Sequence, residues 1–323
     1  MGVGVVVTGK HRQMAVLMGV LVALLWGFLG LGHPSQAAAV GVANLTAKTR
    51  TPYSTLNLRS CASTSCTVLR SVPHGTLLTL TAASGDWFKT SYRGATGWVH
   101  SRYTVLQGTP SKTLRRGNTS RKMVAYTFDA GSDLGNTGKI LDFLKNRNIK
   151  AGFGLTGTWA AAHPTYVKRI FGEGHLIFDH TWDHKSFTGF STGKAALTPA
   201  RRTEELIRAN NKIRGLTGHT TRPYFRPPYG DYNSGVLRDA GANRFSRTTL
   251  WTLDSWGWKG LTAAQICDRV VDSMSAASNG GNGYILLFHV GSQSRDANAL
   301  PCITDTLKKR GFKFGTIPQV TAP

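Results

Sequence analysis

The chain has 323 residues, of which 41% are hydrophobic and 10% are aromatic. A chain of this length is expected to form about two domains, and its share of apolar residues excludes wholesale disorder. Lys and Arg number 39 against 16 Asp and Glu, so the formal net charge is +23, which points to nucleic acid, an anionic membrane surface or an anionic cell wall as a neighbour.

Residues 1–39 have the pattern of a secretion signal. Basic residues at 10–12 precede an apolar run over 14–31, and small residues at 37–39 suit a signal peptidase. The apolar run is almost long enough to cross a bilayer, so an uncleaved membrane anchor is the alternative. We expect cleavage, and therefore a secreted, wall-associated protein with no other membrane span.

Export would bring teichoic acids, anionic glycans and lipid headgroups within reach, so we expect no nucleic-acid partner. The four cysteines should form disulfides in an oxidising compartment. Three connectivities are open, and we favour the pairs Cys61–Cys66 and Cys267–Cys302, because they keep each bridge inside one domain. A zinc site is the alternative, but neither pair has the spacing of a zinc finger.

Segment 45–106 contains five runs that are typical of short strands, with a turn about every ten residues. The runs are 55–59, 67–72, 76–80, 87–92 and 96–100. This spacing predicts a small all-β barrel.

Three features of this segment are similar to a bacterial SH3 (SH3b) domain: Asn57-Leu58-Arg59-Ser60, Trp87 and Gly97-Trp98-Val99. The resemblance covers 45–106, and it implies recognition of peptidoglycan or its cross-bridge peptides. Trp87 and Trp98 either pack in the core, which we favour, or stack on a ligand.

Residues 107–121 are polar and basic and contain Gly and Pro, which is typical of a linker. The remainder, 122–320, alternates short buried strands, such as 123–128, with helical apolar spacing, such as 137–146. That alternation predicts a mainly parallel α/β sheet or barrel, and therefore a two-domain protein.

Ionisable residues follow five of the predicted strands. They are Asp129, His180 with His184, Arg226, Asp254 and His289. In α/β folds the carboxyl ends of the strands form the ligand site, and five such residues are hard to explain by packing alone. The i, i+4 spacing of the two histidines on one side of a turn suits a divalent metal.

Five ordered motifs across 122–320 are similar to those of the polysaccharide deacetylases, the NodB-homology domains of carbohydrate esterase family four. They are Thr127-Phe128-Asp129-Ala130-Gly131, His180-Thr181-Trp182-Asp183-His184, Arg226-Pro227-Pro228-Tyr229-Gly230, Asp254-Ser255-Trp256-Gly257-Trp258 and Leu287-Phe288-His289. The resemblance implies a distorted (β/α) barrel and a metal-dependent carbohydrate deacetylase, a hydrolase of non-peptide C–N bonds. Zn²⁺ is the expected metal, with Co²⁺ as an alternative.

The resemblance also implies a role for each matching residue. Asp129 resembles the catalytic base, and Arg226 resembles the residue that orients it. His289 resembles the general acid, and Asp254 resembles its carboxylate partner. The remaining implied roles are metal ligand for His180 and His184, backbone N–H oxyanion donor for Tyr229, and substrate contact for Tyr229, Trp256 and Leu287.

The first motif departs from the family pattern, in which a second aspartate ligates the metal, because Ala130 stands at that position. We expect Asp133, in the same Gly-rich loop, to supply the missing ligand, and helix capping is its alternative role. Asp179 and Asp183, which flank the histidines, are secondary candidates. If none of them ligates, the domain would bind metal weakly or be inactive.

These patterns predict a secreted monomer that removes N-acetyl groups from peptidoglycan amino sugars and is held at the wall by the SH3b-like domain. Anionic wall polymers are a further expected contact, and chitin-type oligomers or O-acetylated xylan are alternative substrates. Ala130 motivates a second class, a non-catalytic wall- or glycan-binding protein. Retention of the other four motif residues, Asp129, Arg226, Asp254 and His289, argues against that class.

Overall fold

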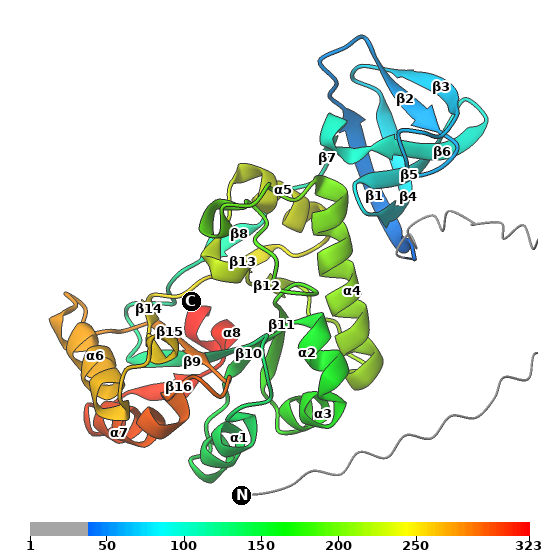
Figure 1. Cartoon of the computed structure of the whole chain (residues 1–323). Helices are drawn as coiled ribbons and strands as arrows, with labels where there is room; N and C mark the ends of the chain where they lie inside the picture. Colours follow the sequence, from blue (N-terminus) through cyan, green and yellow to red (C-terminus); the bar gives the residue numbers. More distant parts are fainter. Residues whose placement is uncertain (1–37) are drawn as a thin grey trace, which may run out of the picture. The chain divides into compact units, whose positions relative to one another are not determined.

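In the computed structural model, which describes residues 38–323, the chain builds two β-sheets (Figure 1). The predicted secretion signal, residues 1–39, lies outside the described residues except at its last two positions. Within the described range, no helix combines the length and the apolar character needed to cross a membrane.

The first sheet has seven antiparallel strands in the order β3-β2-β6-β5-β4-β1-β7. They are β1 (Val40–Thr49), β2 (Thr55–Arg59), β3 (Val68–Pro73), β4 (Leu77–Ser84), β5 (Trp87–Tyr92), β6 (Ala95–His100) and β7 (Thr104–Leu106), with a 3-10 turn, η1 (Ser101–Tyr103), before β7. The five predicted strands correspond to β2–β6. The sequence pattern did not predict β1, which adjoins the predicted signal, or β7, which has only three residues.

Alternating side chains fill the core of this sheet. In β2, Leu56 and Leu58 are buried while the residues before each of them are exposed. A Cβ on Gly97 of β6 would lie 2.4 Å from the carbonyl oxygen of Arg59, so glycine allows β6 to approach β2. Trp87 is buried, its ring centroid 4.9 Å from that of His100, which agrees with a packing role.

The second sheet is parallel and curls into a half-barrel with helices outside it (Figure 1). Eight strands run in the order β14-β15-β9-β10-β11-β12-β13-β8, and β16 pairs with β9. They are β8 (Lys112–Leu114), β9 (Met123–Ala130), β10 (Gly152–Leu155), β11 (Leu176–Asp179), β12 (Tyr224–Phe225), β13 (Arg247–Thr249), β14 (Leu253–Asp254), β15 (Ile285–His289) and β16 (Lys313–Gly315). The predicted linker, 107–121, contains β8, which pairs in parallel with β13.

The helices follow the strands along the chain. They are α1 (Thr137–Asn146), α2 (Gly157–Ala162), α3 (Pro164–Gly172), α4 (Pro199–Thr217), α5 (Ser234–Ala242), α6 (Ala263–Ala276), α7 (Asp296–Lys309) and α8 (Ile317–Thr321), with 3-10 turns η2 (Phe190–Thr192), η3 (Pro228–Gly230) and η4 (Gly257–Lys259). Alternate side chains of the central strand β9 lie in two different environments. Tyr126 and Phe128 pack into the main hydrophobic core, whereas Thr127 and Asp129 contact Arg226.

Both disulfides have the predicted pairing. Cys61–Cys66 closes the loop between β2 and β3, and Cys267–Cys302 joins α6 to α7.

Helix α4 connects the two sheets. Ala200 and Ile207 of this helix belong to the hydrophobic core of the first sheet. At its amino end, Asp86 of the β4–β5 turn accepts hydrogen bonds from Thr198 Oγ1 (2.9 Å) and Arg201 Nε (2.8 Å).

Candidate active site

The parallel registers bring the predicted site residues to one edge of the second sheet. Asp129 at the end of β9 lies opposite His289 at the end of β15. Asp254 ends β14 beside β15, while His180 and Arg226 follow the neighbouring strands β11 and β12. Residues separated by up to 160 positions therefore meet at the carboxyl ends of the strands, as parallel sheets require.

Arg226 is fully buried and holds Asp129 in place. Its Nη1 donates to Asp129 Oδ1 at 2.7 Å, and its other nitrogens donate to Thr127 Oγ1 and to the carbonyls of Thr249 and Leu250. Burial alone would raise the pKa of Asp129, but Arg226, His180 and His289 outweigh it and lower the pKa. Asp129 is thus an ionised carboxylate at neutral pH, with Oδ1 engaged and Oδ2 toward His180.

His180 and His184 form a pair of neutral imidazoles. His180 Nδ1 lies 2.9 Å from the carbonyl oxygen of Arg226, and its Nε2 lies 3.5 Å from Asp129 Oδ2. The two histidine rings are 4.8 Å apart. Burial lowers the pKa of His180, and it lowers the pKa of His184 to about 4, with His180 adding to the effect.

Several loops at this edge have unusual backbone conformations. Thr181, His184, Tyr229 and Trp256 all have φ between +61° and +67°, a region that is costly for residues with a Cβ. Such residues cluster at functional sites because the surrounding structure holds them there. Glu205 of α4 helps to fix the loop between Thr181 and His184, because its Oε2 accepts from the backbone N–H groups of Trp182 (2.9 Å) and Asp183 (3.1 Å).

The edge encloses a cavity of about 380 Å³. Its lining includes Asp129, Asp133, His180, His184, His289, Trp258 and the loop residues 291–294. Arg226, which is fully buried, and Asp254 are not among the lining residues. Of the predicted substrate contacts, Leu287 is buried, Tyr229 places its ring 4.9 Å from that of His184, and Trp256 is half-exposed beside Arg269.

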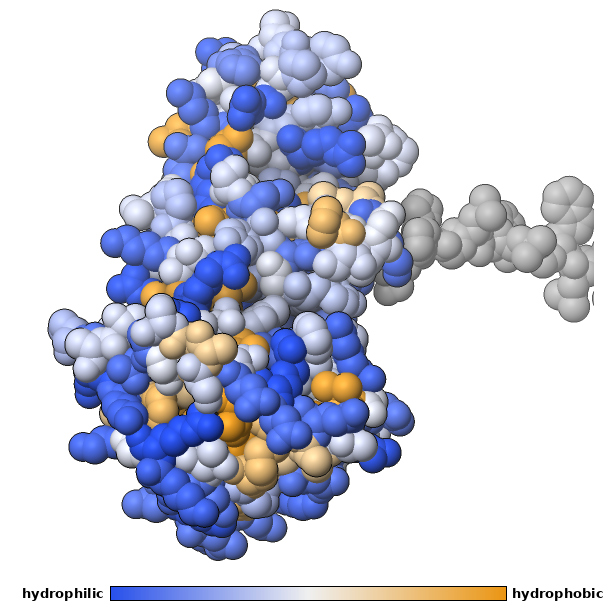
Figure 2. Space-filling view, turned by 90° about the vertical axis from the view of Figure 1, so that its left-hand side faces the viewer, coloured by the Kyte–Doolittle hydropathy of each residue, from blue (hydrophilic) through white to orange (hydrophobic). Residues whose placement is uncertain are grey.

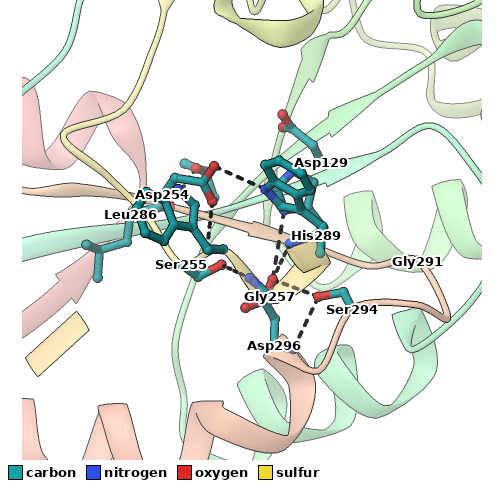
Figure 3. A network of polar contacts seen from close by, with 12 residues as sticks. Asp129, Asp254, Ser255, Gly257, Leu286, His289, Gly291, Ser294 and Asp296 are labelled. Atoms are coloured by element: carbon teal, nitrogen blue, oxygen red, sulfur yellow. Dashed lines mark hydrogen bonds and ion pairs between the residues drawn. The ribbon is translucent and has the colours of Figure 1, made fainter. Parts of the chain in front are cut away.

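Figure 3 shows the surroundings of His289. Asp254, the predicted partner of His289, accepts from Trp256 N (3.0 Å) and from the indole Nε1 of Trp258 (3.2 Å). Asp296, which sequence reasoning missed, accepts from His289 N at 2.8 Å and has Oδ2 3.9 Å from His289 Nδ1. Asp296 lies outside all five motifs. An aspartate in the first turn of a helix is common, so its position alone does not indicate a functional residue.

Comparison with known proteins agrees with this geometry. Residues 116–246 match the family model for polysaccharide deacetylases, and residues 54–105 match that for bacterial SH3 domains. The chain is 33% identical over 207 residues to a peptidoglycan-N-acetylglucosamine deacetylase of Bacillus cereus, covering 63% of this chain and 70% of that protein. The chain belongs to the polysaccharide deacetylase family.

Two further likenesses to polysaccharide deacetylases support the assignment. The peptidoglycan-N-acetylmuramic acid deacetylase PdaA of Bacillus subtilis is 30% identical over 204 residues, which cover 63% of this chain and 73% of PdaA. The crystal structure of the Bc1960 peptidoglycan N-acetylglucosamine deacetylase matches with a TM-score of 0.57 at 32% identity, over 64% of this chain and 92% of that one.

A metal in this polysaccharide deacetylase would find an incomplete ligand set. His180 and His184 suit it, because both are neutral and the Nδ1 of His180 is fixed by a backbone carbonyl. The described residues nevertheless contain no cluster of three His, Cys, Asp or Glu side chains that would hold a metal ion. Catalytic zinc sites usually have three protein ligands, so the residues present do not fit such a site.

The candidates for the third ligand are engaged elsewhere. Asp133 accepts hydrogen bonds from the backbone N–H (2.9 Å) and the hydroxyl of Ser292. Its alternative capping role is not seen either, since Asn136 occupies the N-cap position of α1. Asp179 accepts from Thr181 N at 2.9 Å, and Asp183 pairs with Lys185 at 2.6 Å. The ligand role of Asp133 stays a prediction.

Proposed function

We propose that this protein is a secreted hydrolase that removes N-acetyl groups from cell-wall amino sugars, with peptidoglycan as the substrate class. The observation that carries the proposal is the buried Asp129–Arg226 pair, whose carboxylate lines the same cavity of a polysaccharide deacetylase as its neighbour His289. The peptidoglycan deacetylases among its relatives support the choice of substrate.

The chain's own residues suit hydrolysis of an acetamide. Asp129, ionised at neutral pH, accepts a proton from the water that adds to the acetyl carbonyl carbon. His289 then donates a proton to the sugar nitrogen as the C–N bond breaks, because an amide anion is too poor a leaving group. The products are acetate and a free amine. We assign the Tyr229 backbone N–H to the developing oxyanion.

The bacterial SH3 domain supports a wall location. A module that binds the wall raises the local concentration of substrate around the linked catalytic domain. The net charge of +23 favours contact with anionic wall polymers as well. We propose that the protein acts as a monomer at the wall.

Acetate release from purified peptidoglycan tests the activity. We expect release by the wild-type protein and a loss of about 10²–10⁴-fold in Asp129→Asn, which removes the base but retains a hydrogen-bond acceptor for Arg226. Mass spectrometry of the digested product then identifies the deacetylated sugar, and chitin oligomers and acetylated xylan test the alternative substrates. Equal release by both proteins would reject Asp129 as the base.

Dependence on a divalent metal is a separate part of the proposal. With His180 and His184 as its imidazole ligands, we expect Zn²⁺ or Co²⁺ to bind more weakly than at three-ligand sites. Calorimetric titration should show binding that is lost in His180→Ala and His184→Ala and weakened in Asp133→Ala. Unchanged binding in Asp133→Ala would leave the two imidazoles as the metal's ligands.

The incomplete ligand set also favours a second candidate function, a non-catalytic wall-binding protein. That function predicts that the folded protein sediments with peptidoglycan but releases no acetate at any metal concentration. Asp129→Asn would then sediment as wild type does.

A further inference from the structure

Asp296 lies directly beneath His289, at the point where the chain leaves the site and enters α7 (Figure 3). Its carboxylate is fully buried. Oδ2 accepts from the backbone N–H of His289 at 2.8 Å and from Ser294 Oγ at 2.9 Å. The same oxygen is 3.9 Å from Nδ1 of the His289 ring.

This contact is not explained by the helix that Asp296 begins. The N-cap residue of α7 is Arg295, and no side chain caps that helix end. The carboxylate turns away from α7, toward the end of β15. Burying a carboxylate is costly unless hydrogen bonds or an opposite charge compensate it, so its position needs another reason.

The fourth sequence motif builds the space around Asp296. A Cβ on Gly257 would lie 2.3 Å from Asp296 Oδ1, so this carboxylate requires glycine at that position. Ser255 of the same motif lies beside Asp296, and its hydroxyl accepts from Gly257 N at 3.2 Å. Two motif residues with no role so far, Ser255 and Gly257, therefore shape the pocket of Asp296.

The ring of His289 is oriented by this arrangement. Its Nδ1 is buried and makes no hydrogen bond within the described structure, and it faces the carboxylate. The side chain is 27% exposed and lines the cavity, so the opposite edge, with Nε2, faces the substrate space. A proton donor to a leaving nitrogen needs that orientation.

We propose that Asp296 is a positioning residue that acts through His289, fixing its main chain and ring and stabilising the protonated imidazole. The proposal rests on the proposed function, because it gives His289 the role of general acid. It assigns to Asp296 the electrostatic role that sequence resemblance implies for Asp254, whose carboxylate bonds to Trp256 and Trp258.

The test compares Asp296→Asn with Asp305→Asn, the same substitution at an exposed position of α7. Asparagine retains an acceptor for His289 N and Ser294 but loses the charge. We expect kcat for acetate release from peptidoglycan to fall at least tenfold in Asp296→Asn while KM stays within about twofold. Asp305→Asn should behave as wild type. Equal kcat in Asp296→Asn and wild type would overturn the proposal.

A second measurement does not need turnover. The ring resonances of His289, identified by their loss in His289→Gln, are titrated by NMR. Loss of the adjacent carboxylate should move the midpoint of this titration to lower pH in Asp296→Asn. Asp129, His180 and His184 also interact electrostatically with His289 and are unchanged in that variant. An unshifted titration would overturn the proposal.

The two measurements separate this inference from the proposed function. If wild type releases no acetate but the titration shifts, the electrostatic pairing stands and the deacetylase function fails. If Asp296→Asn does not fold, Ser294→Ala removes a single bond to the same oxygen and should change kcat and the titration in the same direction by a smaller amount. Wild-type values in that variant would overturn the proposal.

Discussion

The buried ion pair of Arg226 and Asp129 contributes both to the stability of the fold and to the proposed catalysis. Arg226 has no exposed surface, so removing Asp129's charge or Arg226 itself leaves an uncompensated ion in the interior. Breaking such a pair typically costs about 3–5 kcal/mol. We expect Arg226→Gln and Asp129→Asn each to lower the free energy of unfolding in that range.

The double variant Arg226→Gln/Asp129→Asn tests whether the lost stability of the single variants arises from breaking the ion pair. With both charges removed, no ion remains unpaired, and the loss should be smaller than the sum of the two single losses by about 1–3 kcal/mol. Urea unfolding of the four proteins at neutral pH measures this coupling. Additive losses would mean that Arg226 acts through its bonds to Thr127, Thr249 and Leu250 and not through the ion pair.

Residues in contiguous motifs were the predictable part of the site. Asp129, His180, His184 and His289 follow apolar strands, and the structure brings them to one cavity. Asp296 could not be found this way, because its relation to His289 depends on a loop that returns the chain beneath the strand end. The ligand role of Asp133 was inferred from proximity along the chain, but the orientation of its side chain depends on Ser292, 159 positions away.

A buried histidine just before β11, beside the start of β10, makes this pair of strands sensitive to acid. His175 Nδ1 accepts from Ala151 N at 3.1 Å, and its ring packs against Phe153. Burial, with Lys150 nearby, lowers the pKa of His175 to about 4. In the unfolded chain the pKa is about 6.5, so the unfolded state binds the proton first and stability falls as pH drops from about 6.5 to about 4.

We therefore expect His175→Asn to flatten this part of the stability profile. Asparagine can accept from Ala151 N but does not titrate. Wild type should lose roughly 3 kcal/mol of unfolding free energy across the window through this group, and the variant should lack that share. Denaturant unfolding at several pH values compares the two proteins, and identical profiles would assign the acid sensitivity to other groups.

The helix pair α6–α7 depends on a covalent link as well as packing. Cys267–Cys302 closes a loop with a sequence separation of 35, for which chain-entropy arguments give about 4 kcal/mol, against about 2 kcal/mol for the separation of 5 at Cys61–Cys66. We expect Cys267→Ala/Cys302→Ala to lower the melting temperature more than Cys61→Ala/Cys66→Ala does. The opposite order in calorimetry would contradict this reasoning.

Elements with strong local patterns were predicted correctly, and those defined by distant partners were not. Strands β2–β6 alternate, and glycine turns separate β3, β4, β5 and β6, so the local sequence identifies these strands. Strand β8 has three residues in a polar, basic segment, and it is a strand only because β13 lies beside it. Pairing with a strand more than 130 positions away leaves no periodic signal.

At the scale of the whole molecule, the two domains share helix α4. Ala200 and Ile207 complete the core of the first sheet, whereas Leu206 and Ile213 belong to clusters of the second domain. The hydrogen bonds of Asp86 to Thr198 and Arg201 add polar contacts at the same junction. On the face shown in Figure 2, exposed apolar side chains form small scattered patches among hydrophilic ones.

A helix shared by two cores should make the described part of the chain unfold as one cooperative unit. Ile207→Asp would place a carboxylate in the core of the first sheet, where α4 packs against it. Burying that charge costs several kcal/mol, and the cost weakens the contact between the two domains. We expect one calorimetric transition in wild type and two in Ile207→Asp, as each domain then melts by itself. Leu77→Asp, at a position of β4 that is 63% exposed, is the control and should keep a single transition. Two transitions in wild type would mean that the SH3-like domain is a tethered module whose contact with α4 adds no stability.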